Sequence, residues 1–132
     1  MLTGDEVARR ALCVLVIEDD AFIGTLYEDV LTEMGHRVCA IETTERGAIA
    51  AAARFKPDLM IVDASLREGS GVGAAQEILR VGFVPHFFVS GDIIGVHEQM
   101  PGAIVLRKPF LEHELARAIQ RALSARPPSS RD

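Results

Sequence analysis

The residues best suited to chemistry stand at the ends of short apolar runs. An acidic run occupies positions 18–20, and Asp63 directly follows Leu-Met-Ile-Val. Two further apolar runs end just before Ser90 and two residues before Lys108, which is one of two lysines in the chain. Lysine is rarely tolerated without a partner at the end of an apolar strand. Carboxylates, a hydroxyl and an ammonium thus occupy comparable positions along the chain.

In open α/β sheets, ligands bind outside the carboxyl ends of the strands, so these side chains are expected to converge at one edge. Closely packed carboxylates repel one another unless a cation joins them. Hard carboxylate oxygens with room for water and phosphate suit Mg²⁺. An Asp beside such a metal can attack phosphorus and form an aspartyl phosphate, while Ser90 and Lys108 hold the phosphoryl oxygens.

Five short apolar runs supply the strands that would position these groups. Each run has four or five residues and lacks alternation, which is typical of parallel strands buried on both faces. Helical patterns separate the runs, so the sequence predicts βαβ units in an open, doubly wound parallel sheet. The predicted strands are residues 13–17, 37–41, 59–62, 85–89 and 103–106.

The spacers contain recognisable helix signals. Phe22, Leu26, Val30 and Met34 recur every four residues, which predicts a helix that buries this face, with Asp20 as its N-cap. The spacer at residues 91–102 is different, because it has a glycine at its centre and leaves little room for a helix of about 11 residues. That helix is predicted to be short or irregular. The other helices are expected to begin at Thr43 or Thr44, at Ser70 or Gly71, and near Leu111.

Composition limits the class of protein. The chain has 132 residues, which fits one domain at roughly 150 residues per domain. With 48% hydrophobic and 25% charged residues, it has the composition of a globular protein and not of a disordered one. The net charge of −5 argues against binding to nucleic acid or to an anionic membrane. No apolar stretch approaches the roughly 18 residues of a membrane span.

The cysteines and the two ends of the chain give further expectations. Cys13 and Cys39 lie in apolar runs, which predicts buried thiols and a reducing, cytoplasmic environment. Thr3 and Glu6 have the spacing of a capping box, which predicts a short helical turn within an N-terminal extension at 1–10. Residues 126–132 are expected to form a polar tail beyond a single domain at 1–125.

The acidic run, Asp63, Ser90 and the Lys-Pro-Phe at 108–110 together resemble the receiver domains of bacterial two-component response regulators. The resemblance extends over roughly residues 11–125. It implies a flavodoxin-like sheet with strand order 2-1-3-4-5. It also implies that a sensor histidine kinase or histidine phosphotransfer protein donates a phosphoryl group, and that an unknown downstream protein receives the signal.

The same resemblance assigns roles to individual residues. Asp63 becomes the phosphoacceptor, and Glu18 and Asp19 become the acidic pair, which leaves Asp20 outside the pair. Mg²⁺ would be held by Glu18, Asp19, Asp63 and the backbone carbonyl of Ser65. Ser90 occupies the position of the switch hydroxyl, and a cis peptide bond before Pro109 would aim Lys108 at the acids.

Two positions depart from the usual receiver pattern. Arg67 stands where many receivers have proline, and Val105 stands where they have the aromatic partner of the switch hydroxyl. Together with Phe-Val-Ser-Gly at 88–91 and the shortened fourth helix, this resembles the FAT GUY receivers, which are mostly stand-alone domains. We therefore expect a different switch, in which phosphorylation orders residues 91–102.

These observations favour a single-domain response regulator that catalyses its own phosphorylation and dephosphorylation without being a turnover enzyme. It would signal by protein contact or act as a phosphate sink. An alternative is a Mg²⁺-dependent aspartyl-phosphate phosphohydrolase, but that family expects a second acid where this chain has Ser65. A third possibility, an interaction module that is never phosphorylated, is disfavoured because Glu18, Asp19, Asp63 and Lys108 are all present.

Overall fold

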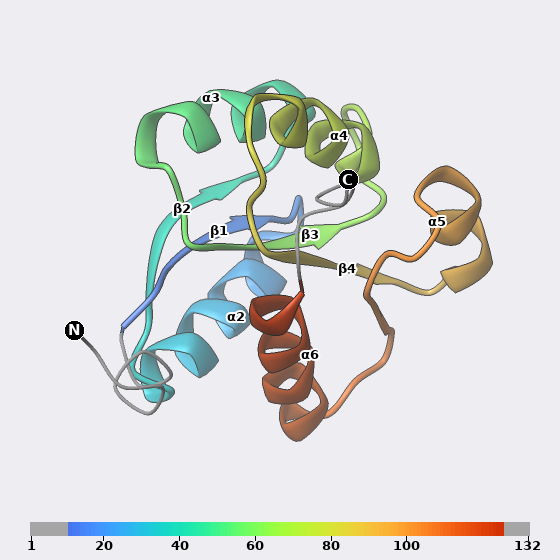
Figure 1. Cartoon of the computed structure of the whole chain (residues 1–132). Coiled ribbons are helices and arrows are strands. Elements are labelled where there is room, and N and C mark those ends of the chain that lie inside the picture. The colour runs from blue at the N-terminus through green and yellow to red at the C-terminus, as the bar shows by residue number, and fades with distance from the viewer. Residues whose placement is uncertain (1–10, 126–132) are drawn as a thin grey trace.

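The computed structural model describes residues 11–125, within which five strands alternate with five helices (Figure 1). The predicted N-terminal turn at 1–10 and the polar tail at 126–132 lie outside the described residues. The strands are β1 (Cys13–Ile17), β2 (Arg37–Glu42), β3 (Leu59–Asp63), β4 (His86–Ser90) and β5 (Val105–Arg107). The helices are α2 (Ala21–Glu33), α3 (Glu45–Phe55), α4 (Gly71–Val81), α5 (Ile93–Gln99) and α6 (Glu112–Ser124).

The strands form one parallel sheet in the order β2-β1-β3-β4-β5. This confirms the predicted doubly wound, flavodoxin-like architecture. In β1 and β3 nearly every residue is buried, as expected for strands with helices on both faces. Because all strands run in the same direction, their carboxyl ends lie along one edge of the sheet. The strands begin and end within two residues of the predicted positions.

Helices α2 and α6 cover one face of the sheet, and α3 and α4 cover the other (Figure 1). Two apolar cores result, one on each side. Side chains of β1 and β3 alternate between the two cores, so Val14 and Val16 face α2 and α6, while Leu15 and Ile17 face α3 and α4. Among residues 11–125, no helix combines the length and the apolar composition that crossing a bilayer requires.

The predicted apolar row of α2 faces the core only in part, because Val30 and Met34 pack against the core and the other two residues do not. Phe22 is 70% exposed and Leu26 is 45% exposed. The residues that α2 buries are Gly24, Tyr27 and Leu31. A four-residue spacing overshoots the helical turn by about 40° at each step, so a row with that spacing winds around the helix. The residues that α2 buries are three and four positions apart, and this spacing keeps them on one face of the helix.

Local sequence signals correctly predicted where three of the helices begin. Asp20, Thr44 and Ser70 cap α2, α3 and α4, and each side chain accepts a hydrogen bond from a backbone N–H of the first turn. Leu111 precedes α6 and is 63% exposed. Helix α5 has only seven residues, which confirms the predicted shortening. Cys13 and Cys39 are half-buried, whereas the sequence predicted buried thiols.

Candidate functional site

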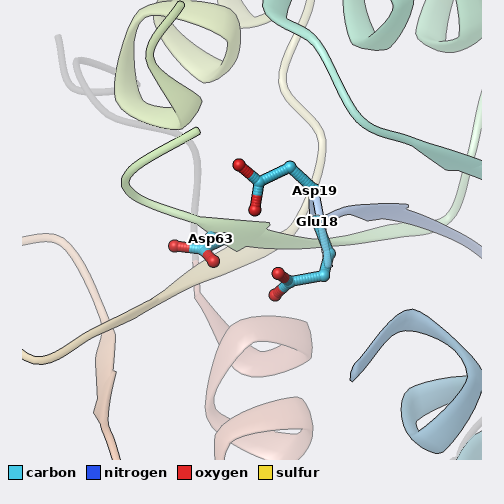
Figure 2. Close-up of side chains that lie close together, drawn as sticks. All are labelled: Glu18, Asp19 and Asp63. Atoms are coloured by element: carbon cyan, nitrogen blue, oxygen red, sulfur yellow. The ribbon is translucent and has the colours of Figure 1, made fainter. Parts of the chain in front are cut away.

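Three carboxylates meet at the carboxyl edge of the two central strands. β1 and β3 pair in parallel with Ile17 opposite Val62, so the next residues, Glu18 and Asp63, lie side by side. One oxygen from each of Glu18, Asp19 and Asp63 lies within 4.8 Å of the others. Figure 2 shows Asp19 directed toward the side of α3 and α4, and Glu18 toward the side of α2 and α6. The predicted convergence of these acids is present in the structure.

Glu18 is 2% exposed, which is unusual for a carboxylate. Its Oε2 accepts a hydrogen bond from the Asp20 amide at 3.0 Å, while its Oε1 is buried without a partner. Burial raises the pKa of Glu18 from its ordinary 4.5 to about 7, against the lowering effect of the Asp20 amide. The negative charge of Asp63 raises this pKa as well, and the positive charge of Lys108 lowers it.

Asp63 is 5% exposed, and each of its carboxylate oxygens has a contact. Oδ1 accepts a hydrogen bond from the Ser65 amide at 3.1 Å, and Oδ2 lies 3.2 Å from the ammonium nitrogen of Lys108. The peptide bond between Lys108 and Pro109 is cis, as the receiver resemblance predicted. Helix α4 begins close behind Asp63, because Gly71 lacks a Cβ that would overlap the Asp63 carbonyl oxygen.

Ser90 ends β4 at the same edge and is 8% exposed. Its hydroxyl accepts a hydrogen bond from the Asp92 amide at 2.9 Å and lies 3.3 Å from the Asp92 carbonyl oxygen. Asp92 in turn caps α5 through the Gly95 amide. Ser90 is also tied to the neighbouring strand end, because its carbonyl accepts the Lys108 amide at 3.0 Å. The hydroxyl therefore contacts the start of α5 and not the acids.

The structure adds Arg67, to which the sequence assigned no role. Asp19 accepts the Arg67 amide at 2.6 Å, and the Arg67 Nε lies 3.9 Å from the same carboxylate oxygen. The Arg67 side chain is 80% exposed, so the ion pair is weak. The loop that contains Arg67 is held at its far end by Glu45, which accepts the Ser70 amide at 2.9 Å. In the sequence, the signal that could have indicated this contact was the arginine four residues after Asp63.

The three carboxylates fit a divalent cation. They supply hard oxygen donors, and the buried Glu18 Oε1 has a free acceptor position. Repulsion between the negative charges of Glu18 and Asp63 contributes to the raised pKa of Glu18, and a bound cation would relieve it. The acidic cluster therefore has the composition and the closeness of a cation site.

Comparisons with known proteins place the chain among signalling proteins. No family model matches it. It is 29% identical over 120 residues to the phyllosphere-induced regulator PhyR of Methylorubrum extorquens, an alignment that covers 88% of this chain and 45% of PhyR. It is 31% identical over 68 residues to the chemotaxis protein CheY of Thermotoga maritima, which covers 52% of this chain and 57% of CheY. The chain spans about half the length of these relatives.

The solved receiver (REC) domain of the response regulator PhyR from Erythrobacter litoralis matches with a TM-score of 0.79 and 29% identity. This match covers 88% of the present chain and 92% of that domain. The chain is a response-regulator receiver domain. Its strand order and its acidic cluster agree with this assignment. The resemblance to the FAT GUY receivers in particular stays a prediction.

Proposed function

We propose that this receiver domain accepts a phosphoryl group on Asp63 in a Mg²⁺-dependent reaction. The donor is a phosphohistidine of a sensor histidine kinase or of a histidine phosphotransfer protein. One observation carries the proposal: a nearly buried carboxylate, Asp63, lies 3.2 Å from the Lys108 ammonium and within a cluster of two further acids. A purely structural Asp needs an ion-pair partner but not two additional carboxylates beside it.

The transfer follows from this arrangement. An oxygen of Asp63 forms a P–O bond while the P–N bond of the donor phosphohistidine breaks. The bonding electron pair stays on the imidazole nitrogen, which takes up a proton. The product is an acyl phosphate on Asp63, and Lys108 neutralises part of the charge that develops on the phosphoryl oxygens.

Glu18, Asp19, Asp63 and the carbonyl of Ser65 would hold the Mg²⁺, which supplies positive charge to the phosphoryl oxygens. Ser90 is the hydroxyl available to a phosphoryl oxygen, once it exchanges its contacts with Asp92. Hydrolysis of the acyl phosphate returns Asp63 to a carboxylate. We expect signalling by contact with a downstream protein, or drainage of phosphoryl groups, and no separate turnover activity. The stand-alone role stays a prediction.

The test is incubation with a small phosphodonor such as acetyl phosphate, with and without Mg²⁺, followed by intact mass spectrometry. The wild type should gain one phosphate that requires Mg²⁺ and is removed by hydroxylamine, as acyl phosphates are. Asp63→Asn should gain none. Asp20→Asn is the matched control, because it changes an adjacent acid that only caps α2, and it should be labelled normally. Labelling of the Asp63→Asn variant would place the acceptor elsewhere.

A further inference from the structure

Two buried polar atoms lie on the α2/α6 side of the sheet without hydrogen-bond partners. They are Glu18 Oε1 and the hydroxyl of Tyr27, and within residues 11–125 no other buried side-chain oxygen or nitrogen lacks a partner. Leaving a buried polar group without a partner costs about 1–3 kcal/mol, so such groups are rare in folded proteins. Both lie on the side of the sheet toward which Glu18, a candidate cation ligand, is directed, which suggests that they are used when the site is filled.

Tyr27 is held rigidly. It lies in α2, is 3% exposed and belongs to the core between the sheet and helices α2 and α6. Its ring stacks on Phe110 with the ring centres 6.0 Å apart and the planes 4° from parallel. Phe110 follows Lys108 by two residues, and Tyr27 and Lys108 line the same cavity of about 610 Å³. The phenol, which projects from α2, is thus packed against the segment that supplies Lys108.

The Tyr27 hydroxyl and the Glu18 carboxylate lie on the same side of the sheet, because Glu18 is directed toward α2 and α6 (Figure 2). Burial raises the pKa of the Tyr27 hydroxyl, and the negative charges of Glu18 and Asp63 raise it further. The two carboxylates are therefore within electrostatic reach of the phenol. A phenol in this position keeps its proton and is available as a hydrogen-bond donor to an acid.

We propose that Tyr27 is a positioning residue of the cation site, whose hydroxyl donates a hydrogen bond to the Glu18 carboxylate, directly or through one water, when Mg²⁺ is bound. The inference rests on the proposed function, since it needs the acids to bind Mg²⁺. The Asp20 amide already orients Oε2 of Glu18, and the phenol would orient the other oxygen. Such partners behind metal ligands fix the ligand and raise affinity.

The chain contains its own reporter for this contact. Tyr27 is its one tyrosine, and it has no tryptophan, so intrinsic fluorescence reports on this phenol alone. Titration of the wild type with Mg²⁺ should change the emission in a saturable way, with the same midpoint as calorimetric binding. Asp19→Asn, which removes a candidate ligand and leaves Tyr27 in place, should lose this response at the same Mg²⁺ concentrations.

Tyr27→Phe tests the hydroxyl itself, because it keeps the ring and its stacking on Phe110. Calorimetry should show about 10-fold weaker Mg²⁺ binding, the lower end of the cost of losing such a partner. Without Mg²⁺, thermal unfolding should be unchanged or occur at a higher temperature, since the variant removes a buried group without a partner. Thr25→Val is the matched control: it removes an exposed hydroxyl from the same helix and should leave Mg²⁺ affinity unchanged.

The outcomes separate this inference from the function beneath it. If the wild type binds no Mg²⁺, the proposed function and the role of Tyr27 both fail. If the wild type binds Mg²⁺ and accepts phosphate, but Tyr27→Phe binds Mg²⁺ equally well, only the role of Tyr27 fails. A wild-type emission that does not change at saturating Mg²⁺ also overturns it, because a new hydrogen bond donated by the phenol must alter the emission.

Discussion

The two halves of the site are built differently. Glu18, Asp19 and Asp63 follow or end β1 and β3, which are strands with a neighbour on each side and helices on both faces. Ser90 and Lys108 belong to the other half, formed by β4, α5 and β5. There β5 has three residues, none of them fully buried, and α5 has seven. Ile94 in α5 is 73% exposed.

This difference suggests that the two halves of the site have different roles. The acids are placed by two central strands whose residues are nearly all buried, so we expect their geometry to change little when a ligand binds. Ser90 and Lys108 border a short segment with few buried side chains, which is where local opening costs least. A phosphoryl group on Asp63 would link the rigid half to the less constrained half. Chemistry and response would then reside in different parts of one sheet edge.

The largest effect is expected from removing the ammonium that bridges the two halves. Lys108→Ala should slow phosphorylation from a small phosphodonor by about 100-fold, the cost of losing one group that stabilises developing negative charge. Time-resolved intact mass spectrometry measures this rate. Arg107→Ala is the control, because Arg107 is an exposed cation in the adjacent position. Equal slowing in both variants would mean that Lys108 contributes only to the general electrostatic field.

The next effect separates the acids within the rigid half. Asp19→Ala should weaken Mg²⁺ binding by more than about 10-fold in calorimetry, since loss of even an indirect partner can cost that much. Asp20→Ala should leave Mg²⁺ affinity nearly unchanged and lower the free energy of unfolding by about 1 kcal/mol, through loss of the α2 cap. Equal losses of affinity would show that the acidic pair is shifted by one residue.

A moderate effect should appear in the pH dependence of stability without Mg²⁺. The pKa of Glu18 is about 7 in the folded protein and 4.5 ordinarily, so the folded state binds this proton more tightly than the unfolded chain. The stability contributed by protonated Glu18 is therefore lost as the pH rises between these values. Glu18→Gln should gain stability relative to the wild type across this range in urea unfolding. Parallel curves for the two proteins would contradict the raised pKa.

The smallest effect concerns the less constrained half. Mg²⁺ with a phosphoryl mimic should slow amide hydrogen exchange within residues 91–102, because Ser90 would exchange its contacts with Asp92 for a contact near Asp63, where Lys108 already lies. Amides in the middle of α6, which packs in the core on the other face of the sheet from Val96, serve as the internal control. Strong protection of 91–102 already in the free protein, or no change on binding, would rule out the proposed ordering.

Much of this molecule was predictable because its signals are local. Apolar runs without alternation predicted the five strands, and the polar residues that follow two of these runs pointed to Asp63 and Lys108. Side chains at helix starts, such as Asp20 and Ser70, gave the caps directly. The short α5 followed from a glycine-rich spacer that has no room for a full helix. The strand order and the cis peptide bond before Pro109 could be predicted only from the resemblance to a family.

The features that the sequence did not predict depend on packing between distant parts of the chain. A four-residue repeat suggested that Phe22 and Leu26 face the core, but a row with that spacing winds around the helix, and α2 buries Tyr27 and Leu31. The contact between Asp19 and Arg67 depends on the course of a loop, which no local pattern specifies. Which side chains of α2 lie on the same side of the sheet as the Glu18 carboxylate depends on the buried face of α2, so the incorrect prediction of that face also hid Tyr27.

The most direct test of the central claim is to locate the phosphoryl group chemically. After incubation with acetyl phosphate and Mg²⁺, borohydride reduces an acyl phosphate on aspartate to the corresponding alcohol, which tandem mass spectrometry can assign to a residue. We predict reduction at Asp63 alone, dependent on Mg²⁺ and on the phosphodonor. Reduction at Asp19 or Asp20, or none in a folded protein that binds Mg²⁺, would contradict the assignment of Asp63 as the phosphoacceptor.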